Sequence, residues 1–148
     1  MFKTSAGIIK PLVYIGIVNS NKLLLVKYKI PPNPTKTGWW IPAPGLDFGE
    51  DPQSKVIDCC KELGLNNPAP QLVDVESFVT PGGWHLIFHF AVRSTSRLQP
   101  TENMNDIKWV TLEELTNMTD IAHGHWEINI GKKFLEFISQ APEAQNVR

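Results

Sequence analysis

The fold is decided by the stretch at residues 38–65, which reads GWWIPAPGLDFGEDPQSKVIDCCKELGL. It begins with a short apolar strand at residues 39–41 and continues through a loop rich in proline and glycine. Asp51 is a candidate N-cap, a proline follows it in the first turn, and Gly64 stands where a left-handed C-terminal cap belongs. These signals predict a helix over Pro52–Leu63.

The predicted helix has two unlike faces. At 100° per residue, one face gathers the apolar side chains Val56, Cys59, Cys60 and Leu63, and the opposite face gathers Asp51, Lys55, Asp58 and Glu62. The apolar face is expected to pack on a core. The charged face either lines a ligand cleft or is an ordinary solvated stripe, and the charge pattern alone leaves both interpretations open.

Length and composition indicate one domain. The chain has 148 residues, of which 42% are hydrophobic, and we expect residues 1–140 to form the domain and residues 141–148 a flexible tail. Fourteen Lys and Arg against fifteen Asp and Glu leave a formal charge of −1, which argues against a global attraction to nucleic acid or an anionic membrane. No apolar run approaches the ~20 residues of a membrane helix, and no signal peptide is recognisable, so we expect a cytoplasmic protein.

Strand patterns flank the opening stretch. Before it, strands at residues 12–18 and 22–28 surround a turn at 19–21 and form a hairpin, and a stiff proline-rich loop spans residues 31–38. Cys59 and Cys60 are adjacent within the helix, so they form neither a disulfide framework nor a zinc site. The later elements are expected at residues 72–79, 84–93 and 107–110 for strands, and at 111–115 and 127–139 for helices.

The order of these elements resembles the Nudix hydrolase family across nearly the whole chain. The family's box runs Gly, five residues, Glu, seven residues, then Arg-Glu-hydrophobe-x-Glu-Glu-x-Gly-hydrophobe, usually entered through Trp-x-Pro-Gly-Gly. Residues 40–44 match that entry with both glycines replaced, residues 48–52 match the middle, and residues 62–65 match the end. Residues 109–115 are similar to the family's Trp-Val strand and short helix. The resemblance implies an α/β fold, a Nudix-like α/β/α sandwich with a central mixed β-sheet.

The box is one residue short within the helix. Gly64 comes fourteen positions after Glu50, where the family has fifteen. Anchored on Glu50, the alignment replaces the motif's Arg with Asp58 and its next Glu with Cys59. Anchored on Gly64, it puts Asp58 at the first Glu position and Cys59 at the hydrophobic position. We favour the second alignment, which keeps two carboxylates four residues apart, although neither restores the full motif.

The resemblance implies a divalent cation, Mg²⁺ or Mn²⁺, that neutralises a diphosphate and activates the attacking water. It assigns Glu50, Asp58 and Glu62 as metal ligands, and Glu62 and Glu102 as catalytic residues. Lys61 places a cation where the family has a Glu, and the helix contains no Arg to pair with Glu50. We therefore expect weaker metal binding than in a member with the full motif.

Substrate-binding candidates lie outside the box. Trp39 borders the proline-rich loop and is the better candidate of the two tryptophans for stacking on a nucleobase, with Trp40 in the core. His85 lies on a strand that is expected to line the cleft, and His125 or its neighbour His123 is placed to contact phosphate or metal. Each also has a simpler interpretation, as a core aromatic or as a polar residue of a surface loop.

Three functions remain open from the sequence. The leading one is metal-assisted hydrolysis of a nucleoside diphosphate linked to another group, with Glu102 or Asp106 of the acidic loop assisting. The second is a catalytically inactive Nudix-fold protein that binds a nucleotide or a protein partner. The third is a hydrolase for a non-nucleotide phosphate. The ligand expected in the first case is a small nucleoside diphosphate derivative, with no role for duplex nucleic acid or membrane, and a homodimer is left open.

Overall fold

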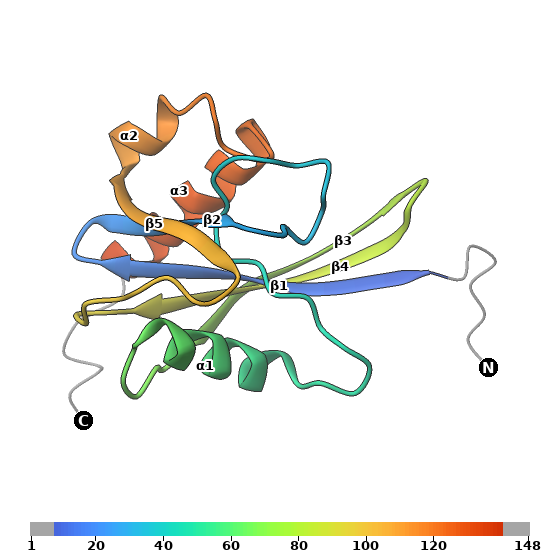
Figure 1. Ribbon diagram of the computed structural model, residues 1–148, viewed down its shortest axis with the longest axis horizontal. Helices are drawn as coiled ribbons and strands as arrows, with labels where there is room; N and C mark the ends of the chain where they lie inside the picture. Colours follow the sequence, from blue (N-terminus) through green and yellow to red (C-terminus); the bar gives the residue numbers. More distant parts are fainter. Residues whose placement is uncertain (1–7, 141–148) are drawn as a thin grey trace.

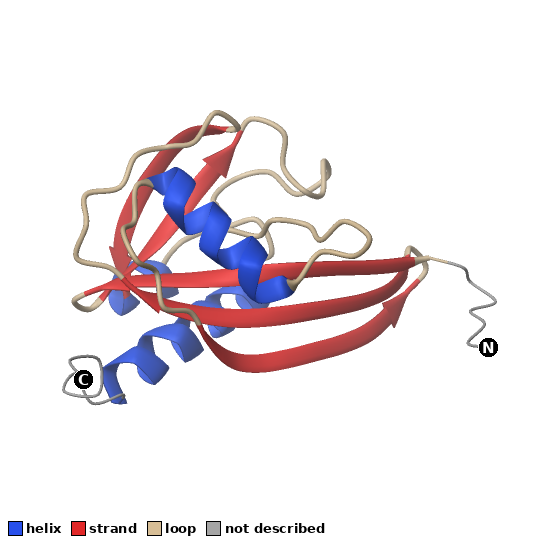
Figure 2. Ribbon diagram, turned by 90° about the horizontal axis from the view of Figure 1, so that it is seen from below, coloured by secondary structure: helices blue, strands red, loops and turns tan. Residues whose placement is uncertain are grey.

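The computed structural model describes residues 8–140, and the expected tail at residues 141–148 lies outside them. A central sheet separates helix α1 on one face from helix α3 on the other, as Figures 1 and 2 show from two sides. No helix among the described residues is long and apolar enough to cross a membrane. The elements in chain order are β1 (Ile9–Asn19), β2 (Lys22–Tyr28), α1 (Pro52–Leu63), β3 (Gln71–Thr80), β4 (Gly83–Arg93), β5 (Met104–Thr111), α2 (Leu112–Thr116) and α3 (His125–Gln140).

The sheet is mixed, with the strand order β3-β4-β1-β2-β5. β1 and β4 pair in parallel from Ile9 opposite Trp84 to Val18 opposite Arg93, and all other neighbouring strands are antiparallel. The parallel pair requires a long crossover, which carries the opening stretch and α1 over one face of the sheet. The predicted α/β class and central mixed sheet are confirmed.

Local signals set the helix ends where we predicted them. Asp51 caps α1 by accepting a hydrogen bond from the Ser54 amide at 2.9 Å, and Gly64 adopts the left-handed conformation at φ 106°. Thr111 opens α2 with a capping box completed by Glu114. These ends depend on contacts within three or four residues, which is why the sequence alone located them.

Two strand predictions needed correction. Residues 39–41 do not form a strand, because this segment makes only isolated bridges, from Trp40 to Val26 and from Trp39 to Ile121. β1 starts at Ile9 and not at residue 12, and it includes Pro11, whose carbonyl accepts the Leu46 amide at 3.1 Å. Residues 42–46 run beside this half of β1 and fill the gap that opens between β1 and β2.

Alternation along β1 gives the sheet two different faces. One set of side chains, Val13, Ile15 and Ile17, is fully buried, and the other set includes Gly16, which lies directly beneath Phe134 of α3. A Cβ atom at Gly16 would lie 2.0 Å from Phe134 Cγ, far inside van der Waals contact. The close approach of α3 to the sheet therefore depends on a glycine at this position.

We predict that Gly16→Ala lowers the free energy of unfolding by about 1–3 kcal/mol, because the added methyl group overpacks the contact with buried Phe134. Urea denaturation of both proteins measures the change. Gly45→Ala is the matched control, since a Cβ there meets no atom within 4 Å. Equal losses in the two variants would show that the Gly16 contact does not limit the packing of α3.

Candidate functional site

The carboxylates predicted to bind metal do not gather in one place. Glu50 accepts the Asp47 amide at 2.7 Å and pairs with Lys55 at 3.3 Å, and these contacts lower the pKa of its carboxyl, the Asp47 hydrogen bond most. Asp58 and Glu62 lie exposed on α1, and neither side chain makes a hydrogen bond or ion pair within the described residues. Among residues 8–140, no three His, Cys, Asp or Glu side chains are arranged to hold a metal ion.

Helix α1 therefore presents two carboxylates that could bind a metal ion, and not three. Asp58 and Glu62 are one helical turn apart on the same exposed side of α1. Mg²⁺ commonly binds proteins through one or two carboxylates and completes its shell with water and substrate phosphates. The pair fits that mode of binding, whereas it does not form a cage built from protein ligands alone.

A cavity of about 730 Å³ opens on the other face of the sheet, beside the start of α3. This volume is in the range of small-molecule sites. The lining comes from β1, β3 and β4, from the proline-rich loop and Trp40 after it, and from the entry to α3 and its first turn. Its residues are Lys10, Leu12, Tyr14, Pro32, Asn33, Pro34, Lys36, Trp40, Glu76, Phe78, His85, Ile87, His123 and Trp126.

The floor of the cavity follows from the strand register. Alternate residues of β1, β4 and β3 point to the α3 face and form rows across the sheet. The first row is Lys10, His85 and Phe78; the second is Leu12, Ile87 and Glu76; and the third, which leads under α3, is Tyr14, His89 and Asp74. Polar and aromatic groups from distant parts of the chain thus share one surface.

Aromatic side chains contribute to both the floor and the walls of the cavity. The indole of Trp126 meets the Tyr14 ring edge-on at 5.4 Å and the His123 ring at 5.5 Å, and His123 in turn meets Trp40 edge-on at 4.7 Å. Phe78 stacks on His85 at 4.9 Å with an interplanar angle of 13°. Tyr14 and Trp40 are only 2% exposed, so the rings that the cavity offers to a flat ligand are the more exposed ones of Phe78, His85, His123 and Trp126.

Charge is unevenly distributed around these rings. Lys10 and Lys36 contribute ammonium groups and Glu76 a carboxylate. The pKa of His85 is lowered, first by its partial burial and then by Lys10, so this imidazole is neutral at pH 7. The cavity thus combines apolar ring surfaces with cations that suit an anionic group.

Comparison with models of protein families found no match, and comparison with curated proteins found none either. Solved structures do match: a Nudix-family hydrolase from Clostridium perfringens is 19% identical, with 86% of this chain and 97% of that chain covered at a TM-score of 0.67. The Nudix domain of Shewanella oneidensis NrtR, crystallised with ADP ribose, is 16% identical, with coverages of 86% and 87% and a TM-score of 0.70. The chain has the Nudix fold.

A third match is a bifunctional NMN adenylyltransferase/ADP ribose pyrophosphatase from Francisella tularensis, crystallised with AMP and a manganese ion. It is 17% identical, and the match covers 81% of this chain and 39% of that chain at a TM-score of 0.61. At these identities the likeness establishes the fold. It confirms the Nudix-like sandwich expected from the sequence.

Of the predicted substrate-binding residues, one lines the cavity and another lies away from it. His85 lines the cavity, as expected. Trp39 does not; the ammonium groups of Lys27 and Lys108 lie over its ring, 5.1 and 4.5 Å from the centroid, and Trp40 lines the cavity instead. Trp40 is only 2% exposed, so its predicted place in the core is confirmed even though it also borders the cavity, and the ligand-binding role of Trp39 stays a prediction. The two neighbours differ because alternate residues of an extended segment point in opposite directions.

The remaining candidates lie outside the cavity. His125 is exposed at the first position of α3, and His123, two residues earlier, takes its place in the cavity wall. Glu102 is exposed in the turn before β5 and is not among the lining residues. Asp106 lies in β5, where its side chain accepts the amide of Ile107. For Glu102, the catalytic role remains a prediction.

Sequence reasoning missed most of the floor. Lys10, Tyr14 and Glu76 carry no motif, and their common surface appears only when three strands are placed in register. Trp126, directly after the His-x-His segment, also belongs to no motif. The two-residue alternation of β1 was the one local signal that could have grouped Lys10 with Tyr14.

A buried carboxylate connects the cavity wall to the Nudix core. Glu127, in the first turn of α3, is 0% exposed. One oxygen accepts the amide of Ile41, and the other accepts the amide of His123 at 3.2 Å and lies 2.9 Å from His123 Nδ1. Because a buried charge is costly unless it is hydrogen-bonded, this carboxylate holds both chain segments in place.

We predict that Glu127→Gln lowers the free energy of unfolding by about 1–3 kcal/mol. The glutamine side chain has only one acceptor oxygen, and its NH₂ group would face a backbone N–H that needs an acceptor. Chemical denaturation measures this loss. Glu136→Gln, an exposed change on the same helix, is the control and is expected to stay within about 0.5 kcal/mol. A Glu127→Gln protein as stable as the control would contradict the role given to this carboxylate.

Proposed function

We propose that this protein binds a small nucleoside diphosphate derivative in the cavity on the α3 face. The observation that carries the proposal is the lining, which brings the aromatic rings and two ammonium groups into one volume of about 730 Å³. Nucleotides combine a flat base, which stacks on aromatic rings, with phosphates, which pair with lysine ammonium groups. The Nudix domain from Shewanella oneidensis and the Francisella tularensis enzyme, crystallised with ADP ribose and with AMP, support this ligand class.

The cavity also suggests the direction of the ligand. Lys10 reaches toward the β3–β4 turn, since a Cβ built on Gly82 would lie 3.1 Å from Lys10 Nζ. Trp126 and Trp40 stand on the walls beside α3. In the proposed complex the phosphates lie toward the lysines and the base lies among the rings. The proposal includes a cytoplasmic location. It includes no role for duplex nucleic acid or for a membrane.

We predict that Lys36→Ala weakens the binding of a nucleoside diphosphate by about tenfold, because a charge-assisted hydrogen bond contributes about 1.5 kcal/mol. Isothermal titration calorimetry with ADP and GDP, with and without magnesium, measures the dissociation constants. Lys29→Ala is the matched control, an exposed lysine that does not line the cavity. No binding of either nucleotide by the unmodified protein would rule the proposal out.

A second candidate function is metal-assisted hydrolysis of the same class of ligand. It is favoured by Asp58 and Glu62, which are exposed, adjacent on α1 and without a partner among the described residues. Mg²⁺ or Mn²⁺ held by this pair would neutralise the diphosphate and lower the pKa of a bound water. The cavity and α1 lie on opposite faces of the sheet, so we rank binding ahead of hydrolysis.

If hydrolysis occurs, we predict that Asp58→Asn and Glu62→Gln each lower the magnesium-dependent rate by about 100-fold, equivalent to about 3 kcal/mol of transition-state stabilisation. A phosphate- or nucleotide-release assay over a panel of nucleoside diphosphate derivatives measures the rate. Glu136→Gln serves as the control for a carboxylate elsewhere on the surface. Turnover that is absent, or equal in all the variants, would exclude the metal-hydrolase function and leave binding alone.

A further inference from the structure

Glu76 stands out in the cavity because it places an anion among aromatic rings, in a site whose other charged groups suit a phosphate. It lies in the second row of the floor, on β3, and its side chain is 36% exposed. A carboxylate here repels phosphate and does nothing for stacking. Its position calls for a ligand group that donates hydrogen bonds.

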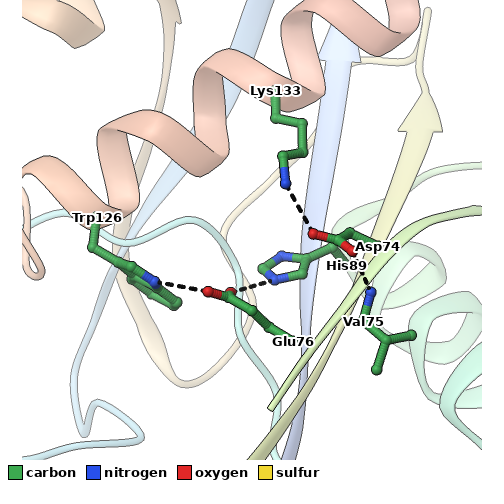
Figure 3. A network of polar contacts seen from close by, with 6 residues as sticks. All are labelled: Asp74, Val75, Glu76, His89, Trp126 and Lys133. Atoms are coloured by element: carbon green, nitrogen blue, oxygen red, sulfur yellow. Dashed lines mark hydrogen bonds and ion pairs between the residues drawn. The ribbon is translucent and has the colours of Figure 1, made fainter. Parts of the chain in front are cut away.

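Two neighbours hold the carboxylate of Glu76 in one orientation. His89 Nε2 lies 3.0 Å from Oε1, and the indole N–H of Trp126 donates to Oε2 at 3.3 Å (Figure 3). His89 comes from β4 and Trp126 from α3, so the two oxygens are held by two different elements. A carboxylate fixed in this way is preorganised for a ligand.

The state of His89 follows from its surroundings. The ring is 2% exposed, and burial is the largest influence on its pKa, which is lowered despite the opposing effect of Glu76. A neutral imidazole has one N–H, and because the carboxylate only accepts, that N–H is on Nε2. Nδ1 is then a bare acceptor, consistent with its lack of a hydrogen-bond partner in the described structure.

Each oxygen of Glu76 retains a free lone pair. A carboxylate has about four acceptor positions and no donor, and here one position on each oxygen is occupied. A ligand with two parallel N–H donors would give each carboxylate oxygen of Glu76 a second hydrogen bond. Guanine presents such a pair at N1–H and its 2-amino group, whereas adenine presents a ring-nitrogen acceptor beside its amino group.

We propose that Glu76 makes the cavity selective for a guanine-type base, whose edge offers two adjacent N–H donors, over an adenine-type base. This inference rests on the proposed function, because it names the base that the bound nucleotide carries. The arrangement along β3 agrees with it. Thr80, at the turn near Lys10, is four positions after Glu76, which is about 13 Å along the strand, so the base edge and the phosphates are kept apart.

The test is a titration of the full chain with GDP, IDP and ADP, followed by calorimetry or by tryptophan fluorescence. We expect GDP to bind about 10- to 100-fold more tightly than ADP, in line with the discrimination of a bidentate base contact. IDP keeps N1–H and lacks the 2-amino group, so its affinity is expected between the two. Glu76→Gln is expected to weaken GDP binding to the level of ADP and to leave ADP binding within about twofold.

Asp74→Asn is the matched control. Asp74 lies two residues away on the same face of β3, but its carboxylate pairs with Lys133 at 2.9 Å and does not line the cavity (Figure 3). This variant is expected to keep the preference for GDP. If Glu76→Gln does not fold, the order GDP, IDP, ADP in the unmodified protein still tests the inference.

The outcomes separate the two proposals. If none of the three nucleotides binds, the proposed function fails, and this inference fails with it. If GDP and ADP bind equally, or if the preference for GDP survives in Glu76→Gln, the protein binds nucleotides and Glu76 does not read the base. An equal loss of both nucleotides in Glu76→Gln would place a ribose hydroxyl at the carboxylate and would also overturn the inference.

Discussion

The buried carboxylate of Glu127 is the interaction on which the arrangement of this protein depends. It satisfies the amides of Ile41 and His123, two groups that are 82 residues apart in the chain. Through Ile41 it positions the segment at residues 39–46, which separates β1 from β2, and through His123 it positions the entry to α3. Glu127 thereby fixes the distance between Trp40 and His123, which belong to the two segments that form the cavity wall.

The separation of β1 from β2 has a second support in Tyr28. Its hydroxyl accepts the amide of Ala43 at 2.9 Å, and its pKa is raised, chiefly by burial. The segment is also bonded to β1, where Val13 and Ile15 donate to the carbonyls of Pro44 and Pro42. Since prolines have no amide hydrogen, the segment accepts from β1 through these carbonyls and cannot become a regular strand there.

The two faces of the sheet serve different chemistry. The face under α1 is packed with apolar side chains, and the charged side of α1 presents the carboxylates of Asp58 and Glu62 to solvent. The third predicted metal ligand, Glu50, precedes the helix and pairs with Lys55. The face under α3 leaves a hollow where the helix begins, and polar groups of three strands meet there. The cavity that we propose as a nucleotide site therefore lies on the face of the sheet away from the carboxylates of α1.

The sequence by itself determined the elements whose causes are local. Asp51, Gly64 and the Thr111 capping box act within a few residues. The order of helices and strands, together with the matched residues at 40–44, 48–52, 62–65 and 109–115, indicated the Nudix fold. Only the tertiary structure decided which side chains share the cavity. Trp39 and Trp40 are neighbours in sequence and point to different surfaces, whereas Glu76 and Trp126 are 50 residues apart and in contact. Strand register and helix docking create such contacts, and no local pattern records them.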